Sequence, residues 1–397
     1  MAAGFKTFGP HERSFRIPSI LLDTLSILLI FLLGREFFGD ENDTAGIMAA
    51  YLYALNPLMI RLVSGTVPDD SVHVINTFFI TLSAYLFAVC ARVNRRSWAV
   101  AGGVSVGLGT LCLSGIGLLG FAAAIPLLYR SKAKRLWPYA LGAFLLAALP
   151  WPLYASSRWP ELYRHESALQ FDHLLHALEG HAHAWWWYLK LLPVHFAVVG
   201  TGWLVWPALA AVLAYALKKR SPGVQALLLW VGLPYVFFSL IATKLYSYPC
   251  ASVAAVCLLA GLAGAAAWRR GPLARGAVAL ALLALAVPRL RADYSAPVWS
   301  TTYDYAALRA VSLKIGAEPG KKVVLNVKDH KSAQVMYYSG VPAYPDAPTP
   351  ALVKDLRARG YRVFVFLEEG ERVAAPGALL VPLPAPLAGP VLHPYEA

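Results

Sequence analysis

The sequence predicts a polytopic membrane protein: an all-α bundle of about 10 to 11 membrane helices with a small C-terminal α/β domain outside the membrane. Three observations predict this fold class. Hydrophobic residues make up 58% and charged residues 14% of the 397 residues, with a mean hydropathy of +0.53, whereas soluble domains carry about 25% charged residues. The apolar residues form blocks long enough to cross about 30 Å of hydrocarbon. From Asp293 onward the composition changes to that of a soluble module.

Hydrophobic segments follow one another along residues 1–292, separated by short basic or Gly/Pro-rich breaks. Most are close to the roughly 20 residues that one helical crossing requires. Trp185–Leu217 is too long for one straight crossing and is interrupted at Gly200 and Gly202, so we interpret it as an interfacial or half-inserted piece followed by one crossing. The predicted segments are Ile17–Phe38, Thr44–Val63, Ser71–Ala91, Trp98–Leu113, Gly115–Tyr129, Leu136–Ala155, Trp185–Leu217, Val224–Ala242, Tyr246–Trp268 and Ala274–Leu290.

The net charge of +13 would suggest a nucleic-acid partner in a soluble protein. Here the basic residues lie in short loops at helix ends, where they direct those loops to the cytoplasm, and we expect no nucleic-acid partner. The alternate loops, residues 64–70, 156–184 and 243–248, then face outward, as does the chain from Arg291 onward. The basic clusters are Arg92, Arg95 and Arg96; Arg130, Lys132, Lys134 and Arg135; Lys218, Lys219 and Arg220; and Arg269, Arg270 and Arg275.

The C-terminal residues 293–397 are predicted to form a small extracytoplasmic α/β domain that follows the transmembrane domain of residues 1–292. Lys322–Val327 and Tyr361–Leu367 alternate or cluster β-branched residues, as strands do. Thr349–Arg359, which lies between them, has the periodicity of a helix. The end of the chain is rich in proline and is expected to be loosely ordered.

Two adjacent carboxylates, Asp69 and Asp70, precede the apolar segment that starts at Ser71, in a loop that we expect to face outward. Acidic residues at a helix N-terminus are favoured by about 0.3 to 1 kcal/mol, so helix capping alone could explain them. Two carboxylates that face a membrane cavity could also serve as a general base or bind a divalent cation. The motif alone leaves both interpretations open, and we name both residues as catalytic candidates.

The outer loop of residues 156–184 holds five of the ten histidines and four acidic residues, which are ligand types for divalent metals. We select Glu179 and His181 as candidate metal ligands. Because their spacing matches no recognised metal motif, solvated residues at the membrane interface are the alternative. The histidines are His165, His173, His176, His181 and His183, and the acidic residues are Glu161, Glu166, Asp172 and Glu179.

A second group of candidates lies in the next outward loop, just outside the membrane. Lys244 is followed by Tyr246 and Tyr248, and a cation at this position would suit a lipid phosphate. A lysine that extends its amine to the membrane surface is the equal alternative. With Arg61, these three residues are the candidate substrate-binding residues.

The order of these features resembles that of a known family. Residues 16–39 contain R-x-P-S and L-G-R-x-x-F-G, similar to a passage of the polyprenol-dependent GT-C glycosyltransferases of families 39 and 83. These are the relatives of 4-amino-4-deoxy-L-arabinose transferase and protein O-mannosyltransferase. The resemblance spans roughly residues 8–267, where the later landmarks occur in the expected order. They are Asn56 and Pro57; Pro68 and Asp69; Pro150 and Trp151; Leu178, Glu179, Gly180 and His181; Trp186, Trp187 and Tyr188; and Lys244, Leu245 and Tyr248.

The resemblance implies transfer of a sugar from a polyprenyl-phosphate donor to a lipid, glycan or protein acceptor. The reaction would occur at the outer face of a bacterial inner membrane. The resemblance also assigns residues: Asp69 or Asp70 matches the family's second acidic position, and Lys244 matches its phosphate-side lysine. Glu179 and His181 match its outer-loop motif. The only cofactor that we expect is a divalent metal.

The sequence departs from the family in two ways. The family's first helix, and the loop that carries its principal acidic residue, would precede the region of resemblance, so we expect a truncated, diverged or misassigned N-terminus. The family often has Lys-Gly where this chain has Ser114 and Gly115. A noncatalytic degenerate transferase or a scaffold that binds lipid-linked sugar is the alternative function. A transporter is a third, but only Asp23 offers a buried charge of the expected kind.

Overall fold

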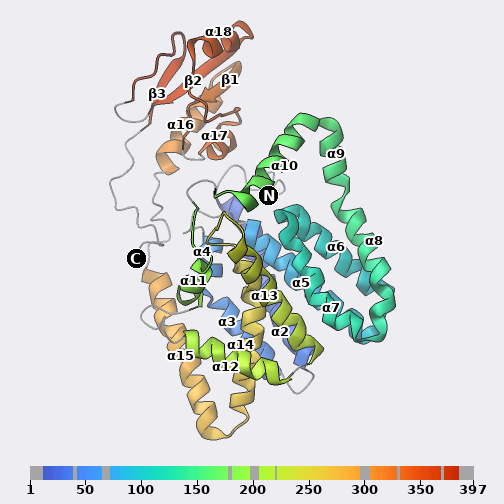
Figure 1. Cartoon of the computed structure of the whole chain (residues 1–397). Coiled ribbons are helices and arrows are strands. Elements are labelled where there is room, and N and C mark those ends of the chain that lie inside the picture. Colours follow the sequence, from blue (N-terminus) through green and yellow to red (C-terminus); the bar gives the residue numbers. More distant parts are fainter. Residues whose placement is uncertain are drawn as a thin grey trace. The chain divides into compact units, whose positions relative to one another are not determined.

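The computed structural model describes residues 12–38, 43–64, 72–177, 181–196, 205–219, 221–295, 305–328, 331–367 and 371–383. The chain divides into two compact units. The larger unit includes Arg13–Ala296, and the smaller unit includes Pro297–Ala397. The larger unit is helical, and the smaller unit contains a three-stranded sheet with accompanying helices (Figure 1).

The larger unit is a bundle of helices (Figure 1). The helices are α2 (Glu12–Phe38), α3 (Asp43–Ala54), α4 (Pro57–Ser64), α5 (Val72–Val93), α6 (Arg96–Leu113), η2 (Ser114–Leu118), α7 (Leu119–Tyr129), η3 (Lys132–Leu136), α8 (Trp137–Ala148), α9 (Pro150–Arg158), α10 (Pro160–Leu175), α11 (Trp187–Phe196), α12 (Val205–Lys219), α13 (Pro222–Leu240), α14 (Cys250–Trp268) and α15 (Pro272–Ser295).

The predicted helical membrane bundle is confirmed. Among the described residues, five helices are long and apolar enough to cross a membrane, or six if the bent pair α3 and α4 counts as one crossing. This is fewer than the predicted total of about 10 to 11, because several predicted segments form helices that are shorter or bent. The five are Arg16–Phe38, Val72–Val93, Lys132–Arg158, Pro222–Leu240 and Cys250–Trp268, and the shorter apolar helices are Gly115–Tyr129 and Pro272–Val287.

A local sequence signal explains the bend of 49° between α3 and α4. Pro57 has no amide hydrogen to continue α3, and proline is favoured at the first position of a new helix. Asn56 precedes it, and its Oδ1 accepts a hydrogen bond from the Met59 amide at 3.1 Å, as a helix-capping residue does. The break therefore starts α4 in a new direction, and α4 carries Arg61.

Small residues allow the helices of the bundle to pack closely. A Cβ atom added to Gly34 of α2 would lie 2.5 Å from the Cα atom of Gly46 in α3. A Cβ atom on Gly261 of α14 would overlap the backbone oxygen of Ala45, which also belongs to α3. In lipid, where apolar surfaces gain little by association, such backbone approaches are a main source of helix contact.

The smaller unit is a parallel sheet of order β1-β2-β3. Alternate side chains of its strands point to opposite faces. Val324, Phe364 and Phe366 are buried in one cluster with residues of α16 and α17, and Val323 and Val365 are buried in another with Val353 of α18. The elements are α16 (Tyr305–Ala317), β1 (Lys321–Leu325), α17 (Ser332–Ser339), α18 (Pro350–Ala358), β2 (Tyr361–Leu367) and β3 (Leu379–Pro382).

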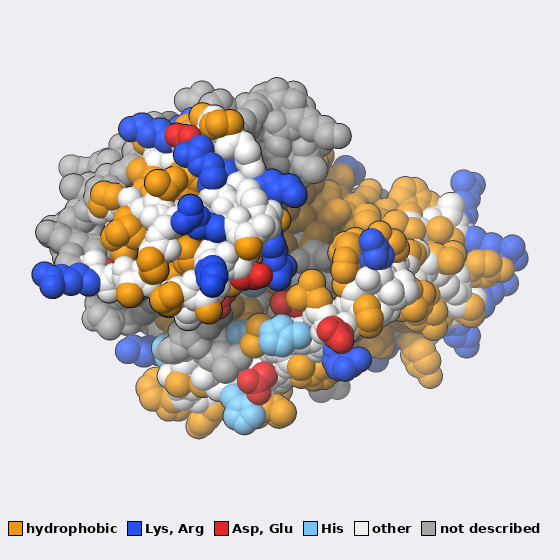
Figure 2. All heavy atoms as spheres, turned by 90° about the horizontal axis from the view of Figure 1, so that it is seen from above, with side chains coloured by type: hydrophobic (Ala, Val, Ile, Leu, Met, Phe, Trp, Pro, Cys, Tyr) orange, Lys and Arg blue, Asp and Glu red, His pale blue; other side chains and the backbone are white. Residues whose placement is uncertain are grey.

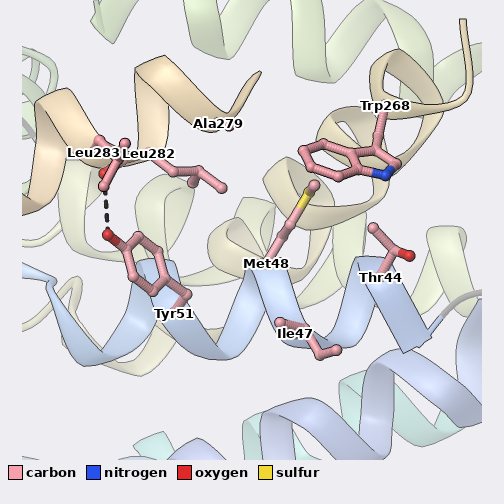
Figure 3. Close-up of a pocket in the computed structure, with 8 residues that line it drawn as sticks. All are labelled: Thr44, Ile47, Met48, Tyr51, Trp268, Ala279, Leu282 and Leu283. Atoms are coloured by element: carbon pink, nitrogen blue, oxygen red, sulfur yellow. Dashed lines mark hydrogen bonds between the residues drawn. The ribbon is translucent and has the colours of Figure 1, made fainter. Parts of the chain in front are cut away.

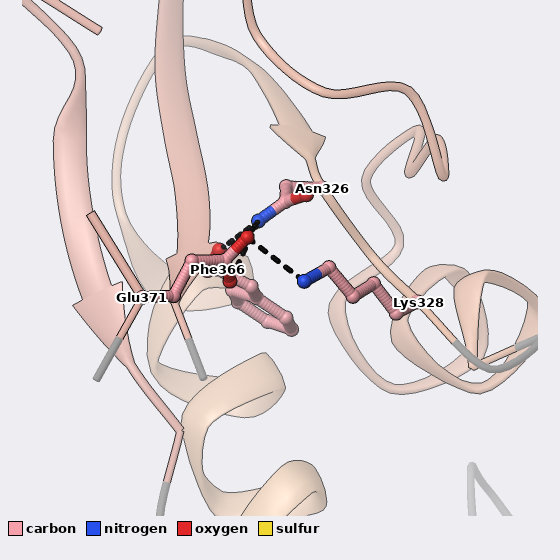
Figure 4. Close-up of polar contacts among 4 residues, drawn as sticks. All are labelled: Asn326, Lys328, Phe366 and Glu371. Atoms are coloured by element: carbon pink, nitrogen blue, oxygen red, sulfur yellow. Dashed lines mark hydrogen bonds and ion pairs between the residues drawn. The ribbon is translucent and has the colours of Figure 1, made fainter. Parts of the chain in front are cut away.

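The predicted strands and helix of the tail are therefore present with small shifts of their ends. A buried asparagine joins the carboxyl ends of β1 and β2 (Figure 4). Asn326 has a φ of 61°, and its Nδ2 donates to the Phe366 carbonyl at 2.7 Å and to both carboxylate oxygens of Glu371 at 3.3 Å. The Lys328 amine pairs with Glu371 at 2.8 Å. Asparagine suits this position because it tolerates the left-handed backbone conformation.

Candidate functional site

The candidate site is built around residues 241–249, which connect α13 to α14 (Figure 1). This connection is held by polar contacts from helices far apart in the sequence. Arg61 of α4, His73 of α5 and Tyr188 of α11 each hydrogen-bond to it. Three separate parts of the bundle therefore position the same short connection.

One group of contacts surrounds Tyr246. The Arg61 guanidinium donates a hydrogen bond to the Tyr246 hydroxyl at 3.2 Å, and the Tyr246 ring meets the His195 ring edge to face, with centroids 4.7 Å apart. Asn56 anchors the helix of His195, because its Nδ2 donates to the His195 carbonyl at 3.0 Å. His195 is fully buried, and among the described residues neither of its ring nitrogens has a hydrogen-bond partner. A cation, a phenol and an imidazole thus lie together inside the helical bundle.

A second group surrounds Tyr248. Its ring stacks on Phe238 of α13 with centroids 4.3 Å apart, and it lies 6.0 Å from the ring of His73. His73 is buried, and its Nε2 is 2.9 Å from the Ser247 hydroxyl. These contacts fix the start of α14 against α5 and α13.

Lys244 is part of this connection and contacts the outer loop. Its amide donates to the His181 carbonyl at 3.1 Å, and its ammonium donates to the Ile241 carbonyl at 2.6 Å. Only 4% of Lys244 is exposed, and burial lowers the pKa of its ammonium, since desolvation disfavours the charged form. An anionic ligand would have to draw this ammonium away from the Ile241 carbonyl.

The outer loop adds imidazoles close to this lysine. The His183 ring stacks on the Trp187 ring with centroids 4.0 Å apart. Burial, and then the charges of His181 and Lys244, lower the pKa of the His183 imidazole. The charges of His181 and Lys244 therefore lie near enough to disfavour the charged form of His183.

Most of the described residues in the rest of the outer loop are exposed. No residue of α10 is buried, and histidine side chains lie near acidic ones on the face seen from above in Figure 2. His176 Nδ1 of this segment lies 2.5 Å from a carboxylate oxygen of Asp172. Among the described residues, no group of three His, Cys, Asp or Glu side chains could hold a metal ion.

The structure brings together some of the predicted site residues. Arg61 contacts Tyr246 directly, Lys244 contacts His181 through the backbone, and Tyr248 lies on the same connection. The two catalytic candidates, Asp69 and Asp70, and the metal candidate Glu179 lie outside the described residues.

Sequence reasoning missed two residues of the site, His73 and His195. Both fall in long apolar segments, where hydropathy hides single polar residues. The sequence did contain a signal for them, because a titratable residue inside a predicted membrane segment is by default a candidate for function.

The chain therefore belongs to the polytopic membrane proteins that hold charged and titratable side chains in a buried site between their helices. Within this class, residues 1–154 match the family described as dolichyl-phosphate-mannose-protein mannosyltransferase. The chain is a relative of the polyprenyl-phosphate-dependent GT-C glycosyltransferases, which confirms the resemblance found in the sequence.

Individual relatives agree with this family. The chain is 31% identical over 318 residues to undecaprenyl phosphate-alpha-4-amino-4-deoxy-L-arabinose arabinosyl transferase of Pseudomonas aeruginosa strain LESB58, a match that covers 73% of this chain and 54% of the relative. It is 30% identical over 268 residues to such an enzyme of Pseudomonas fluorescens strain Pf0-1, with 63% of this chain and 46% of the relative covered. The chain thus spans about half the length of the curated relatives it matches.

Solved structures share the fold. The structure of ArnT from Cupriavidus metallidurans in the apo state has a TM-score of 0.61 at 17% identity and covers 86% of this chain and 73% of that one. The archaeal oligosaccharyltransferase AglB from Archaeoglobus fulgidus, in complex with an inhibitory peptide and a dolichol-phosphate, has a TM-score of 0.54 at 15% identity. That match covers 83% of this chain and 53% of AglB. The membrane bundle therefore has the GT-C fold.

Proposed function

We propose that this multi-pass membrane protein is a glycosyltransferase that moves a sugar from a polyprenyl-phosphate donor to a lipid, glycan or protein acceptor. One observation carries the proposal: Arg61 of α4 contacts Tyr246 on the connection that also holds Lys244. Two cations and a phenol in a low-dielectric site suit the phosphate of a lipid-linked donor. The family match and the GT-C fold support the same activity.

The proposed reaction is an inverting displacement. The acceptor hydroxyl attacks the anomeric carbon of the donor sugar, while the bond from that carbon to the phosphate oxygen breaks. The electron pair leaves with the polyprenyl phosphate, and the hydroxyl proton passes to the carboxylate of Asp69 or Asp70. Arg61 and Lys244 stabilise the charge that develops on the departing phosphate. Tyr246 and Tyr248 hold the connection that carries Lys244.

A divalent metal at Glu179 and His181 is part of the proposal. A carboxylate and an imidazole are suitable ligands, and the His181 carbonyl accepts a hydrogen bond from the Lys244 amide. A metal there would add positive charge near the donor phosphate. We expect a chelator to lower donor affinity in the wild type and to have no effect in the double variant Glu179→Gln, His181→Gln.

We further propose that the site faces the outside of a bacterial inner membrane and that the smaller unit is extracytoplasmic. The basic clusters at the opposite helix ends support this orientation. Cysteine labelling of intact cells tests it in a variant without native cysteines. A membrane-impermeant reagent should modify cysteines placed at the exposed positions 182 and 354, and should leave one at the exposed position 134 unmodified.

Reconstitution in liposomes tests the activity. The 397-residue chain is supplied with a radiolabelled polyprenyl-phosphate sugar and a lipid acceptor, and sugar transfer is followed in the wild type and in Asp69→Asn, Asp70→Asn and the double variant. Loss of an essential acid-base group costs several orders of magnitude in rate, whereas a helix cap survives the change, since both residues cap well. If the chain is catalytic, the double variant should lose at least 100-fold in turnover relative to the wild type.

Two outcomes would change the conclusion. Binding of the donor without any turnover would identify a noncatalytic protein that binds lipid-linked sugar. Full activity in the double variant would remove Asp69 and Asp70 from the mechanism and return them to helix capping.

A further inference from the structure

An apolar groove lies between α3, α14 and α15, away from the candidate site (Figure 3). Its volume is about 560 Å³, within the range of small-molecule sites. No residue of the candidate site lines it. The lining residues are Thr44, Ile47, Met48, Tyr51, Trp268, Ala279, Leu282 and Leu283.

The polar groups of the groove are unevenly placed. At one end of the groove, the Tyr51 hydroxyl donates to the Leu282 carbonyl at 3.1 Å (Figure 3), so this hydroxyl is already satisfied. The Thr44 hydroxyl and the Trp268 indole lie together towards the other end (Figure 3). Thr44 follows the first residue of α3, and Trp268 is the last residue of α14. The groove therefore has an apolar interior and a polar end.

The polar end is also basic. Trp268 is followed by Arg269 and Arg270, both exposed, and the exposed Arg275 lies one turn into α15. Arg275 packs back on this end, because its Nε donates to the Trp268 carbonyl at 3.3 Å. The acidic residue beside Thr44, Asp43, is already paired with Arg35 at 2.9 Å. The described charges around the opening thus leave it positive.

We propose that this groove binds an anionic glycerophospholipid, with one acyl chain between α3 and α15 and the phosphate at Arg269 and Arg270. Charge complementarity favours this occupant over a zwitterionic lipid, because basic pockets between membrane helices attract anionic headgroups. From Thr44 to Tyr51 the wall of α3 extends about 10 Å, which accommodates part of an acyl chain. The lipid fills the space between α15 and the rest of the bundle and so holds α15 in place.

Lipid titration followed by native mass spectrometry tests the headgroup contact. The full chain in detergent is titrated with phosphatidylglycerol and, separately, with phosphatidylcholine. The double variant Arg269→Gln, Arg270→Gln should lose phosphatidylglycerol affinity about tenfold or more. The matched control, Lys218→Gln with Lys219→Gln, removes two exposed cations from α12 and should leave affinity unchanged. Equal losses in both double variants, or equal affinity for the two lipids, would show nonspecific boundary lipid and overturn the proposal.

A second variant tests the groove itself. Ala279→Phe fills the space between Met48 and Leu282, whereas Leu280→Phe changes a neighbouring residue that is 68% exposed and does not line the groove. A phosphatidylglycerol with a photoreactive acyl chain should crosslink to Met48 or Leu283 in the wild type and in Leu280→Phe, and should lose this crosslink in Ala279→Phe. Competition by polyprenyl phosphate at equal concentration, or crosslinking unaffected by Ala279→Phe, would contradict the proposed occupant.

Discussion

Each of the two units is stabilised internally by a different kind of contact. In the membrane unit, glycines such as Gly34 and Gly261 bring helix backbones together, and side chains such as Arg61 make polar contacts between distant helices. In the smaller unit, large apolar side chains such as Phe364 and Phe366 are buried on the faces of a sheet. The comparison teaches that enlarging a residue should damage the first unit most, whereas truncating one should damage the second.

Enlarging a glycine in the membrane unit should have the largest effect. We expect Gly261→Leu to abolish the folded bundle, because its side chain would overlap the backbone of α3, and interiors tolerate overpacking poorly. Gly232→Leu is the control, since an added Cβ atom there meets nothing within 4 Å. Size-exclusion profiles and thermal stability in detergent measure the difference. A monodisperse, wild-type-like Gly261→Leu protein would refute the packing argument.

Truncation of a core side chain should have the next largest effect, confined to the smaller unit. Phe366 is 1% exposed, and we expect Phe366→Ala to cost about 3 to 5 kcal/mol. Hydrogen exchange of the full chain should show faster exchange in β1 and β2 and unchanged protection in α5 and α14. Leu380→Ala, at a position 51% exposed, serves as the control. Loss of protection throughout the membrane helices would show that the two units do not respond independently.

Removal of the buried amide in the smaller unit should have a moderate effect. Asn326→Ala leaves the Phe366 carbonyl and the Glu371 carboxylate without this donor, and we expect a cost of about 1 to 3 kcal/mol. Lys328→Gln removes only a partly exposed ion pair, which contributes about 0 to 1 kcal/mol. The same hydrogen-exchange experiment compares the two variants. A larger loss in Lys328→Gln would reverse the assigned importance of the two contacts.

The smallest expected effect is a change of donor affinity with pH. It would distinguish a buried lysine, whose pKa is lowered, from an arginine that stays charged. Because burial lowers the pKa of Lys244, its charge is lost at a lower pH than that of a free lysine, which titrates near about 10.4. Affinity for polyprenyl phosphate should therefore fall as the pH rises, at a lower pH than the titration of a free lysine would give, while the phosphate is already fully ionised. Lys244→Arg keeps its charge and should bind with a flat profile. Identical profiles would exclude Lys244 from the phosphate site.

Folding stability should change with pH in the opposite sense. A lowered pKa means that the unfolded chain binds the Lys244 proton more tightly, so the stability contribution of this group increases as the pH rises between its lowered folded value and its ordinary unfolded value. One pH series can therefore distinguish the two quantities, because the stability contribution of Lys244 increases with pH whereas donor affinity decreases.

Much of the fold follows from patterns along the sequence. Hydropathy identified the membrane bundle, and β-branched residues identified β1 and β2. The strand β3 was not predicted, because it has only four residues and exists through pairing with β2. The shortened and bent helices were missed because hydropathy alone does not show where a helix breaks, as at Asn56 and Pro57.

The candidate site was predictable in part. Residue chemistry and the family resemblance selected Arg61, Lys244, Tyr246 and Tyr248, but the contact between Arg61 and Tyr246 joins residues 185 positions apart. Such a contact depends on the helix packing, which no local pattern encodes. His195 was missed for the same reason, since its importance comes from burial beside Tyr246.

Equilibrium binding of polyprenyl phosphate to the purified full chain tests the central claim most directly, namely that Arg61 and Lys244 form the site for a lipid-linked phosphate. We expect Arg61→Gln and Lys244→Gln each to weaken binding about tenfold or more, since charge-assisted hydrogen bonds contribute about 1.5 to 3 kcal/mol. Arg164→Gln, which removes an exposed cation from α10, should bind like the wild type. Unchanged affinity in both site variants, or an equal loss in Arg164→Gln, would contradict the assignment of this site.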